Sequence, residues 1–478
     1  MSGERSPGVK LIIVGVIGAV LMVPLFMVFA LVFDRQHQAR VAQNSITASW
    51  AGPQVVAGPL LVVPYTTRIE YTETIDGKPV ERTRESRQNL YLSPASQTID
   101  TVLDPEVRVR GSIHRTVVYE AAITGEARFA LPPDLDRLGI KPEDLILDEA
   151  IVQMPISDPR GLQTDAQLSA EGDSLELRPG LGNKDKGTGV HAFLDWSEGE
   201  ALTIAFTYGL RGSTAFSLVP RGEESDLSVG STWPHPSFTG AFLPSEGARE
   251  VSEDGFKASW SISNLALGQS LVSTEAPGLP FISTDADDYE FGARSARGEE
   301  KAATIRLMEP VDLYKQVERA LKYGFLFIGF TFLTFLMFDI VGGARVASAE
   351  YGLTGAGLIL FFVMLLAFAE VIGFGLAYLV ASGAIIGLLT TYSAAVLGGW
   401  RRAGFIAALL TGLYAVLYVL LNLEQFALVI GSLMLFVALA AVMFATRGVE
   451  WSRVSLKSEE AEQAEAEQAS IEEGNNPA

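Results

Sequence analysis

Two stretches of the chain are almost entirely apolar, and a long polar stretch separates them. The first apolar stretch covers residues 9–33, and the second runs from Tyr323 to Ala445 and consists mainly of Leu, Ile, Val, Phe, Ala and Gly. The polar stretch between them covers residues 34–322. Apolar runs of this length are typical of transmembrane helices, so the pattern predicts a membrane protein with a large polar insertion.

The second apolar stretch starts without a turn residue. In VERALKYGFLFIGFTF, residues 317–332, a charged segment becomes apolar at Tyr323. At about 1.5 Å per residue the run 323–341 covers roughly 29 Å, which is close to the hydrocarbon thickness of a bilayer. A membrane helix satisfies its own backbone hydrogen bonds, so we expect one unbroken helix with Glu318 and Lys322 at the headgroups.

Length divides the rest of the apolar region into further helices. The run 353–400 would measure roughly 70 Å as a single helix, so it must fold back, and the expected bend is at Glu370–Gly373. The predicted C-terminal bundle has helices at residues 323–341, 353–370, 374–397, 403–421 and 426–445. Together with the helix at 9–33, the pattern predicts an α-helical transmembrane bundle of about six helices.

Lys and Arg in the short loops indicate the orientation. In an alternating arrangement of these helices, one side carries Arg5, Lys10, Arg345, Arg401, Arg402, Arg447 and Arg453. This side is expected to be cytoplasmic, together with residues 1–8 and 446–478, which leaves residues 34–322 in the periplasm. The run 9–33 is longer than the apolar core of a signal peptide and lacks an Ala-x-Ala site, so we expect an uncleaved anchor.

The polar stretch 34–322 has the partial alternation of β-strands. β-branched and aromatic residues are frequent in segments 107–131, 201–210 and 256–267, and 58–92 is typical of a long hairpin that turns at Asp76-Gly77. Scattered Gly, Pro and Ser favour short antiparallel connections. We therefore expect an antiparallel, sandwich-like β-rich domain in one or two lobes, with a boundary near Pro179–Gly189 if there are two.

Composition excludes several classes of function. A net charge of −20 without a basic cluster argues against a nucleic-acid partner. The absence of Cys excludes disulfides, thiol catalysis and thiolate metal sites. No catalytic or phosphate-binding motif is present, and His37, His114, His191 and His235 lack metal-ligand spacing, so we expect neither an enzyme nor a cofactor. The acidic segment 458–474 predicts a solvated, largely disordered tail.

Acidic residues near membrane depth are candidate functional residues, because burying a charge in lipid is costly. Asp339 lies near the end of the helix predicted at 323–341, where it is expected to reach the interface. Glu370 caps a turn at the outer surface if the chain bends there; if it is buried, it relays protons or binds a cation. Glu424 is expected in a short outer loop.

One loop of the polar domain is a candidate contact surface. Trp233, His235 and Phe238 lie in a segment stiffened by two prolines, Pro234 and Pro236. Exposed aromatic residues in such a loop are suited to binding a partner, whereas buried ones belong to an ordinary connection between strands. The sequence leaves both interpretations open.

Several segments together resemble one known family, the inner membrane protein CreD family, also called cell envelope integrity protein CreD. The segments are SWAGPQVVAGPLLVVPY (49–65), STWPHPSFTGAFLP (231–244), PVDLYKQVERALKYGFLFIGFTFLTFLMFD (310–339), AEVIGFGLAYLVA (369–381) and LYAVLYVLLNLEQFALVIGSLMLFVALAAVMFATRGVEW (413–451). The chain has Ala369-Glu370-Val371 where the family pattern has Ser-Glu-His, and Glu424-Gln425 where it has an acidic pair. Glu370 therefore matches the pattern, and a role of that histidine does not transfer.

The resemblance implies an inner-membrane protein with a large periplasmic domain, linked to the Cre two-component system and to envelope stress, with no catalytic residues to carry over. The implied partners are the lipid bilayer and a periplasmic protein or envelope polymer bound by the exported domain. The alternative is a transporter or flippase that uses the C-terminal bundle with Glu370 as an intramembrane carboxylate. An enzyme would require clustered carboxylates in a cleft within residues 34–322.

Overall fold

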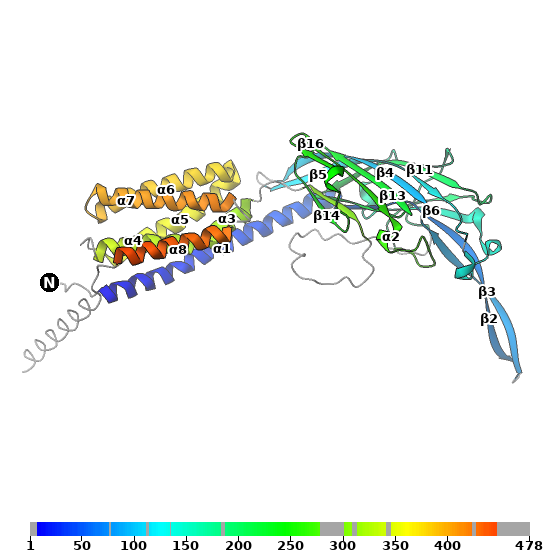
Figure 1. The fold of residues 1–478 in the computed structure, drawn as a ribbon, viewed down its shortest axis with the longest axis horizontal. Helices are drawn as coiled ribbons and strands as arrows, with labels where there is room; N and C mark the ends of the chain where they lie inside the picture. Colours follow the sequence, from blue (N-terminus) through cyan, green and yellow to red (C-terminus); the bar gives the residue numbers. More distant parts are fainter. Residues whose placement is uncertain are drawn as a thin grey trace, which may run out of the picture. The chain divides into compact units, whose positions relative to one another are not determined.

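The computed structural model describes residues 7–75, 78–110, 114–133, 135–182, 187–277, 301–307, 313–340, 346–422 and 427–446. These residues form two compact units. The helical unit contains the described residues up to Ala39 and from Leu313 onward, and the β-rich unit contains Arg40 to Leu307. Figure 1 labels the helices of the first unit and some of the strands of the second. The predicted acidic tail and Glu424 lie outside the described residues.

The helical unit is built from long apolar helices. They are α1 (Pro7–Trp50, whose end belongs to the β-rich unit), α3 (Leu313–Lys322), α4 (Gly324–Ile340), α5 (Ser348–Ile372), α6 (Phe374–Val396), α7 (Trp400–Asn422) and α8 (Ala427–Thr446). Among the described residues, five helical segments are long and apolar enough to cross a membrane: α1, α3 with α4, α5, α6 and α7. This confirms the predicted class of helical membrane protein with a β-rich insertion.

The helix predicted to be continuous through residue 323 has a one-residue interruption. Tyr323 separates α3 from α4, and the backbone there is tightened by hydrogen bonds from Tyr323 N to Ala320 O (3.2 Å) and from Leu326 N to Tyr323 O (3.0 Å). At Gly324 a Cβ would lie 3.1 Å from Phe362 Cζ, so glycine permits close packing where α4 begins. The polar segment that forms α3 also has a buried face, because its residues Tyr314, Val317, Ala320 and Leu321 lie in the core of the bundle.

Aromatic residues fill the centre of the helical unit. Phe335 on α4 and Phe361 on α5 are fully buried, and the rings of Phe361 and Tyr414 have centroids 4.6 Å apart. The Tyr378 hydroxyl donates to the backbone O of Tyr414 at 2.6 Å. Polar atoms at membrane depth must find hydrogen-bond partners within the protein, because lipid offers none. The bond between Tyr378 and Tyr414 meets this requirement and links α6 to α7.

Helix α1 extends further than the predicted anchor at 9–33. It continues through the polar residues 34–50 and ends at Trp50, so the β-strands start at Gln54 rather than soon after Phe33. The polar residues after Phe33 contain no Pro or Gly before Gly52, so nothing in the backbone ends the helix earlier. The segment 313–322, which was predicted as part of the polar domain, likewise belongs to the helical unit and not to the β-rich unit.

The described strands of the β-rich unit form three sheets. The smallest has the order β1 (Gln54–Ala57), β12 (Ala215–Val219), β18 (Ala303–Leu307), β14 (Pro236–Gly240). The second has the order β17 (Val272–Ser273), β3 (Lys78–Leu92), β2 (Leu60–Ile75), β6 (Ala150–Pro155), β10 (Gly189–Leu194), β9 (Arg178–Pro179). The largest has the order β15 (Arg249–Ser252), β16 (Gly255–Ser263), β13 (Glu224–Ser231), β4 (Ser96–Arg110), β5 (His114–Phe129), β11 (Leu202–Ser213), β7 (Gln167–Ala170), β8 (Asp173–Ser174). A short helix, α2 (Asn264–Leu267), follows β16.

Most pairs between these described strands are antiparallel, as predicted, and two are parallel: β1 with β12 and β13 with β4. The predicted long hairpin at 58–92 is present as β2 and β3, which pair from Leu61 with Leu92 to Ile75 with Lys78. This hairpin extends beyond the other strands of the unit (Figure 1).

One hydrophobic core joins the three sheets. It contains Leu61 from the second sheet, Ile99 and Ile123 from the largest, and Phe216 and Ile305 from the smallest. Each of these side chains is at most 1% exposed. The alternation of the strands supplies this core, because every second side chain faces inward.

The boundary predicted at Pro179–Gly189 does not divide two lobes. Strands β9 and β10 on either side of it pair in one sheet, with Val190 opposite Pro179. His191 in β10 is buried, and its Nδ1 lies 3.0 Å from the carbonyl O of Gly180. The glycine-rich composition of this segment is typical of a linker between lobes. In the structure the segment instead connects two neighbouring strands of one sheet.

Candidate functional site

Asp339 is the buried partner of an ion pair at one end of the helical unit. It lies in the last turn of α4, its side chain is 2% exposed, and its Oδ1 is 2.9 Å from Nζ of Lys10 on α1. The sequence predicted an interfacial carboxylate, and the structure shows one that is covered and neutralised by a specific partner. A carboxylate in this position stabilises the packing of α1 on α4 and is not free to bind a substrate cation.

Glu370 occupies a similar position on the last turn of α5. Its Oε1 accepts a hydrogen bond from the Tyr314 hydroxyl at 3.1 Å and lies 3.9 Å from Nε of Arg35 on α1. The chain bends at Gly373, whose φ of +80° favours glycine. Glu370 therefore lies next to a turn, and its recorded partners come from α3 and α1.

The two cations lie far apart on α1. At about 1.5 Å per residue, Lys10 and Arg35 are separated by roughly 37 Å along the helix, about the thickness of a bilayer with part of its headgroup regions. Each pairs with a carboxylate at a helix end of the bundle. The two ion pairs therefore attach α1 to the other helices at both ends of its apolar region.

The predicted contact loop places its aromatic rings toward the core. Phe238 on β14 packs edge-to-face with Phe256, at a centroid distance of 5.7 Å, and near Trp260 at 6.2 Å. Trp233 is half-buried against the same core, and His235 is exposed. The geometry matches a connection between strands more closely than an exposed aromatic contact.

The C-terminal end of α1 is fixed in the β-rich unit by two arginines. The guanidinium of Arg108 lies 3.7 Å from the centroid of a Trp50 ring, and that of Arg211 lies 4.6 Å away. The indole Nε1 of Trp50 is 3.5 Å from the carbonyl O of Tyr119. Cation–π contacts of this kind each contribute roughly 0.5–1 kcal/mol at partly exposed sites.

A carboxylate close to this helix end is also paired. Asp158 accepts hydrogen bonds from Nε and Nη2 of Arg160 at 2.8 Å and 2.7 Å, and Arg160 Nη1 donates to the carbonyl O of Ala48 at 3.2 Å. These bonds from the Arg160 guanidinium hold the pKa of the Asp158 carboxyl below its ordinary value. The contacts tie the end of α1 to the start of a turn that follows β6.

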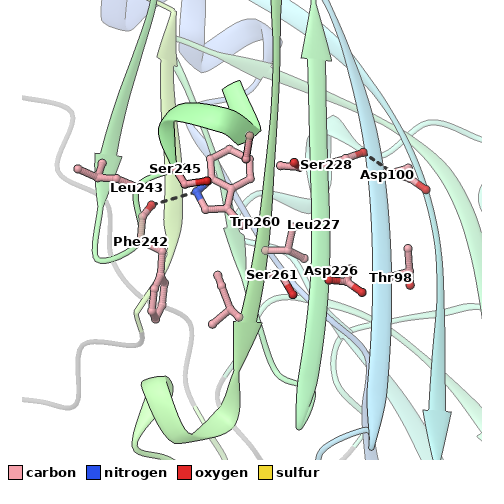
Figure 2. A pocket seen from close by; sticks show the side chains of 13 residues that line it. Thr98, Asp100, Asp226, Leu227, Ser228, Phe242, Leu243, Ser245, Trp260 and Ser261 are labelled. Carbon is pink, nitrogen blue, oxygen red and sulfur yellow. Dashed lines mark hydrogen bonds between the residues drawn. The ribbon is translucent and has the colours of Figure 1, made fainter. Parts of the chain in front are cut away.

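A cavity of about 480 Å³ lies in the β-rich unit, on the largest sheet. Figure 2 shows its lining on β4, β13 and β16 and on the segment after β14. The lining residues are Thr98, Asp100, Asp226, Leu227, Ser228, Phe242, Leu243, Ser245, Ala248, Ser259, Trp260, Ser261 and Ile262. None of these residues carries a positive charge.

Strand register arranges the polar lining residues in two rows. Asp226 is opposite Thr98 on β4 and Ser261 on β16, and Ser228 is opposite Asp100 and Ser259. Directly opposite side chains on one face of a sheet lie about 4.5–5.5 Å apart at Cβ, so each row presents three neighbouring polar groups. Alternation explains why all six point to the same face while Leu227 and Trp260 anchor the strands from the other.

The polar groups of the cavity are largely unused within the protein. The Ser228 hydroxyl donates to Asp100 Oδ1, and Trp260 Nε1 donates to the carbonyl O of Phe242 at 3.2 Å (Figure 2). Within the described part of the chain, the side chains of Asp226, Thr98 and Ser261 have no hydrogen-bond or ion-pair partner. A cavity with such groups can donate and accept hydrogen bonds to a ligand.

The sequence contains a signal for this site that motif searching does not detect. Short polar residues occupy alternate positions in SQTID (96–100), SDLS (225–228) and SWSI (259–262), next to buried apolar residues. Each segment alone looks like an ordinary solvated strand face. Among the described residues, no three His, Cys, Asp or Glu side chains lie together in a group that could hold a metal ion.

Comparisons with known proteins agree with the architecture. The family described as "Inner membrane protein CreD" matches residues 6–452. The chain is 33% identical to Inner membrane protein CreD of Escherichia coli (strain K12), over 92% of this chain and 93% of that protein. A crystal structure from Legionella pneumophila, described as a candidate nutrient binding protein, is 9% identical, covers 57% of this chain and 85% of its own, and has a TM-score of 0.25, too low to support an argument.

The family match extends over both the helical unit and the β-rich unit, and the similarity to the Escherichia coli protein is of comparable extent. With helices that are long and apolar enough to span a membrane, the chain belongs to the CreD family of inner membrane proteins.

Proposed function

We propose that the β-rich unit of this inner membrane protein lies in the periplasm and binds a component of the cell envelope, and that the helical unit is its membrane anchor. The role is cell-envelope integrity under stress, exerted by binding and not by catalysis. The observation that carries the proposal is the cavity on β4, β13 and β16, where the side chains of Asp226, Thr98 and Ser261 have no hydrogen-bond or ion-pair partner among the described residues.

The distribution of Lys and Arg supports the orientation. Lys10 lies near the start of α1 and Arg401 and Arg402 near the start of α7, on the side that the positive-inside rule assigns to the cytoplasm. In the same arrangement the segment between α1 and α3 is translocated. Both termini are then cytoplasmic.

The pairing of the membrane carboxylates supports an anchor over a transporter. A transport site would need a carboxylate that exchanges partners during the cycle. Asp339 and Glu370 instead contact cations of α1, Lys10 and Arg35. Both pairs are internal to the helical unit, so each stabilises the helix packing on which an anchor depends.

Single-cysteine labelling tests the location. Because the chain has no Cys, a Leu243→Cys variant carries one thiol, at a side chain that is 63% exposed and lines the cavity. A membrane-impermeant maleimide should label it in intact cells with a permeabilised outer membrane. The Arg401→Cys variant should be labelled only after lysis. Labelling of Arg401→Cys alone in intact cells would overturn the proposed orientation.

Photo-crosslinking tests the binding function. A photoreactive amino acid at Leu243 should trap an envelope component in living cells, because it lines the cavity. The matched control is Leu138, which is 50% exposed in the same unit and does not line the cavity. Equal adduct patterns at both positions, or none at Leu243, would argue against the cavity as the binding site.

A further inference from the structure

The charges of the cavity restrict its ligand. Among the described residues that line it, Asp100 and Asp226 are the only ionisable ones, and none is Lys, Arg or His. A phosphate or carboxylate in the cavity would meet two negative charges without a compensating cation. The ligand class is therefore uncharged or cationic, and lipid phosphates, nucleic acids and acidic peptides are disfavoured.

The hydrogen-bonding groups restrict it further. Carboxylates accept hydrogen bonds, and the hydroxyls of Thr98, Ser259 and Ser261 both donate and accept. Across the strands these groups repeat about every 4.8 Å in two parallel rows. A surface of this kind matches a flat molecule that presents several hydroxyl or amide groups along its length.

Apolar residues also line the cavity. Phe242 and Leu243 follow β14, Phe242 is half-buried, and Leu243 is 63% exposed. The bond from Trp260 Nε1 to the carbonyl O of Phe242 holds this segment beside β16 (Figure 2), and Phe242 also packs against the hydrophobic core. A ligand in the cavity thus has polar partners on the sheet and apolar contact on one side.

We infer that the cavity binds an uncharged saccharide chain that carries N-acetyl groups. Its hydroxyls and amide N–H groups donate to Asp226 and Asp100 and exchange hydrogen bonds with the Ser and Thr hydroxyls. Its N-acetyl methyl groups contact Phe242 and Leu243. This inference rests on the proposed binding function and names its ligand class.

The test uses the full-length protein in detergent and the β-1,4-linked tetramer of N-acetylglucosamine as the probe, with calorimetry as the measurement. Asp226→Asn keeps the shape and removes the charge of one acceptor, and it should weaken binding about tenfold, as expected for one charged hydrogen bond. Ser261→Leu fills part of the cavity and should abolish detectable binding. Asp226 and Ser261 lie on the exposed face of the sheet, so both variants should fold, which thermal unfolding checks.

The same sheet face provides matched controls. Glu126 is the next residue in the Asp226–Thr98 row, and Thr124 is the next in the Ser228–Asp100 row, both on β5 and outside the cavity lining. Glu126→Gln and Thr124→Leu should leave the dissociation constant within about twofold of the unsubstituted protein.

Each outcome decides the inference. Saccharide binding that is lost in the cavity variants and kept in the controls supports it. Binding that is equal in all variants overturns it, because the sugar then binds elsewhere. No binding at millimolar saccharide also overturns it; if Leu243 still crosslinks a protein in cells, the proposed binding function survives with a peptide ligand, and if Leu243 crosslinks nothing, both fail.

Discussion

In the helical unit the carboxylate of Asp339 is 2.9 Å from the ammonium of Lys10, whereas in the β-rich unit the carboxylate of Asp226 lines a cavity without a partner among the described residues. The difference follows from the surroundings. A charge among apolar helices must be neutralised locally, while a charge on a solvated sheet face is stabilised by water until a ligand replaces it. The paired carboxylate of Asp339 therefore stabilises helix packing, whereas the unpaired carboxylate of Asp226 can accept hydrogen bonds from a ligand.

The strongest test of the division into two units is a core substitution in one of them. Phe216 on β12 is fully buried and packs edge-to-face on Tyr119, with centroids 6.0 Å apart. Phe216→Ala should destabilise the β-rich unit by about 3–5 kcal/mol, because it leaves a large cavity. Limited proteolysis should then cut the β-rich unit while the helical unit stays in the membrane fraction.

The matched control for that substitution is Phe193→Ala, because Phe193 is 50% exposed. This variant should change protease resistance little. Loss of membrane integration in Phe216→Ala would contradict the independence of the two units.

The second test removes Lys10, the partly exposed partner of the buried Asp339. Lys10→Met should destabilise the helical unit by about 2 kcal/mol, since Asp339 is then covered and unpaired. Adding Asp339→Asn should restore part of the loss. Thermal unfolding in detergent measures both effects.

Lys322→Met is the control, because Lys322 pairs with Glu318 on the exposed side of α3, where an (i, i+4) pair contributes only about 0.2–0.5 kcal/mol. Equal shifts at the two lysines would remove the distinction between buried and exposed pairs.

A smaller effect is expected at the other end of α1. Glu370→Gln keeps an acceptor for the Tyr314 hydroxyl and removes a 3.9 Å contact with a partly exposed Arg35, so stability should fall by about 1 kcal/mol or less. Tolerance of cells to envelope stress should not change if the helical unit is an anchor. If the bundle is a transporter that uses this carboxylate, the same substitution should abolish the phenotype while the β-rich unit still folds.

The smallest effect is a pH dependence in the β-rich unit. Arg160 lowers the pKa of Asp158 in the folded protein, below an unfolded value near 3.9. The ionised carboxylate therefore stabilises the fold above about pH 4, and this contribution is lost as the pH falls through the folded pKa. Asp158→Asn should lower the urea midpoint at pH 7 and match the unsubstituted protein at a pH below the folded pKa. A difference between the two proteins that is the same at every pH would exclude Asp158 ionisation as its cause.

Hydrophobic patterning predicted the membrane helices well because lipid imposes one requirement on every residue that faces it. It placed helices near α5 (Ser348–Ile372), α6 (Phe374–Val396) and α7 (Trp400–Asn422), with the bend now seen at Gly373. The ends were less well predicted. Helix α1 continues to Trp50 through residues that are neutral toward helix or loop, and its end is fixed by contacts with Arg108 and Arg211 from distant strands.

The candidate residues show the same limit. The sequence singled out Asp339 and Glu370 because isolated acids in apolar runs are conspicuous, but it did not identify Lys10 and Arg35 as their partners. It also named Trp233 and Phe238 as candidate contact residues, but their rings pack against the core. The cavity residues were missed, since Ser, Thr and Asp at alternate strand positions are common on any solvated sheet.

The sequence by itself determined the class of this protein: apolar runs long enough to span lipid, a polar insertion with strand periodicity, and a composition without cysteine or basic clusters. Only the tertiary structure decided which charges pair and which strands lie side by side. Asp226 and Thr98 are neighbours because β13 pairs in parallel with β4, across more than a hundred residues of chain. Local propensity cannot encode such a pairing, because it depends on how all three sheets share one core.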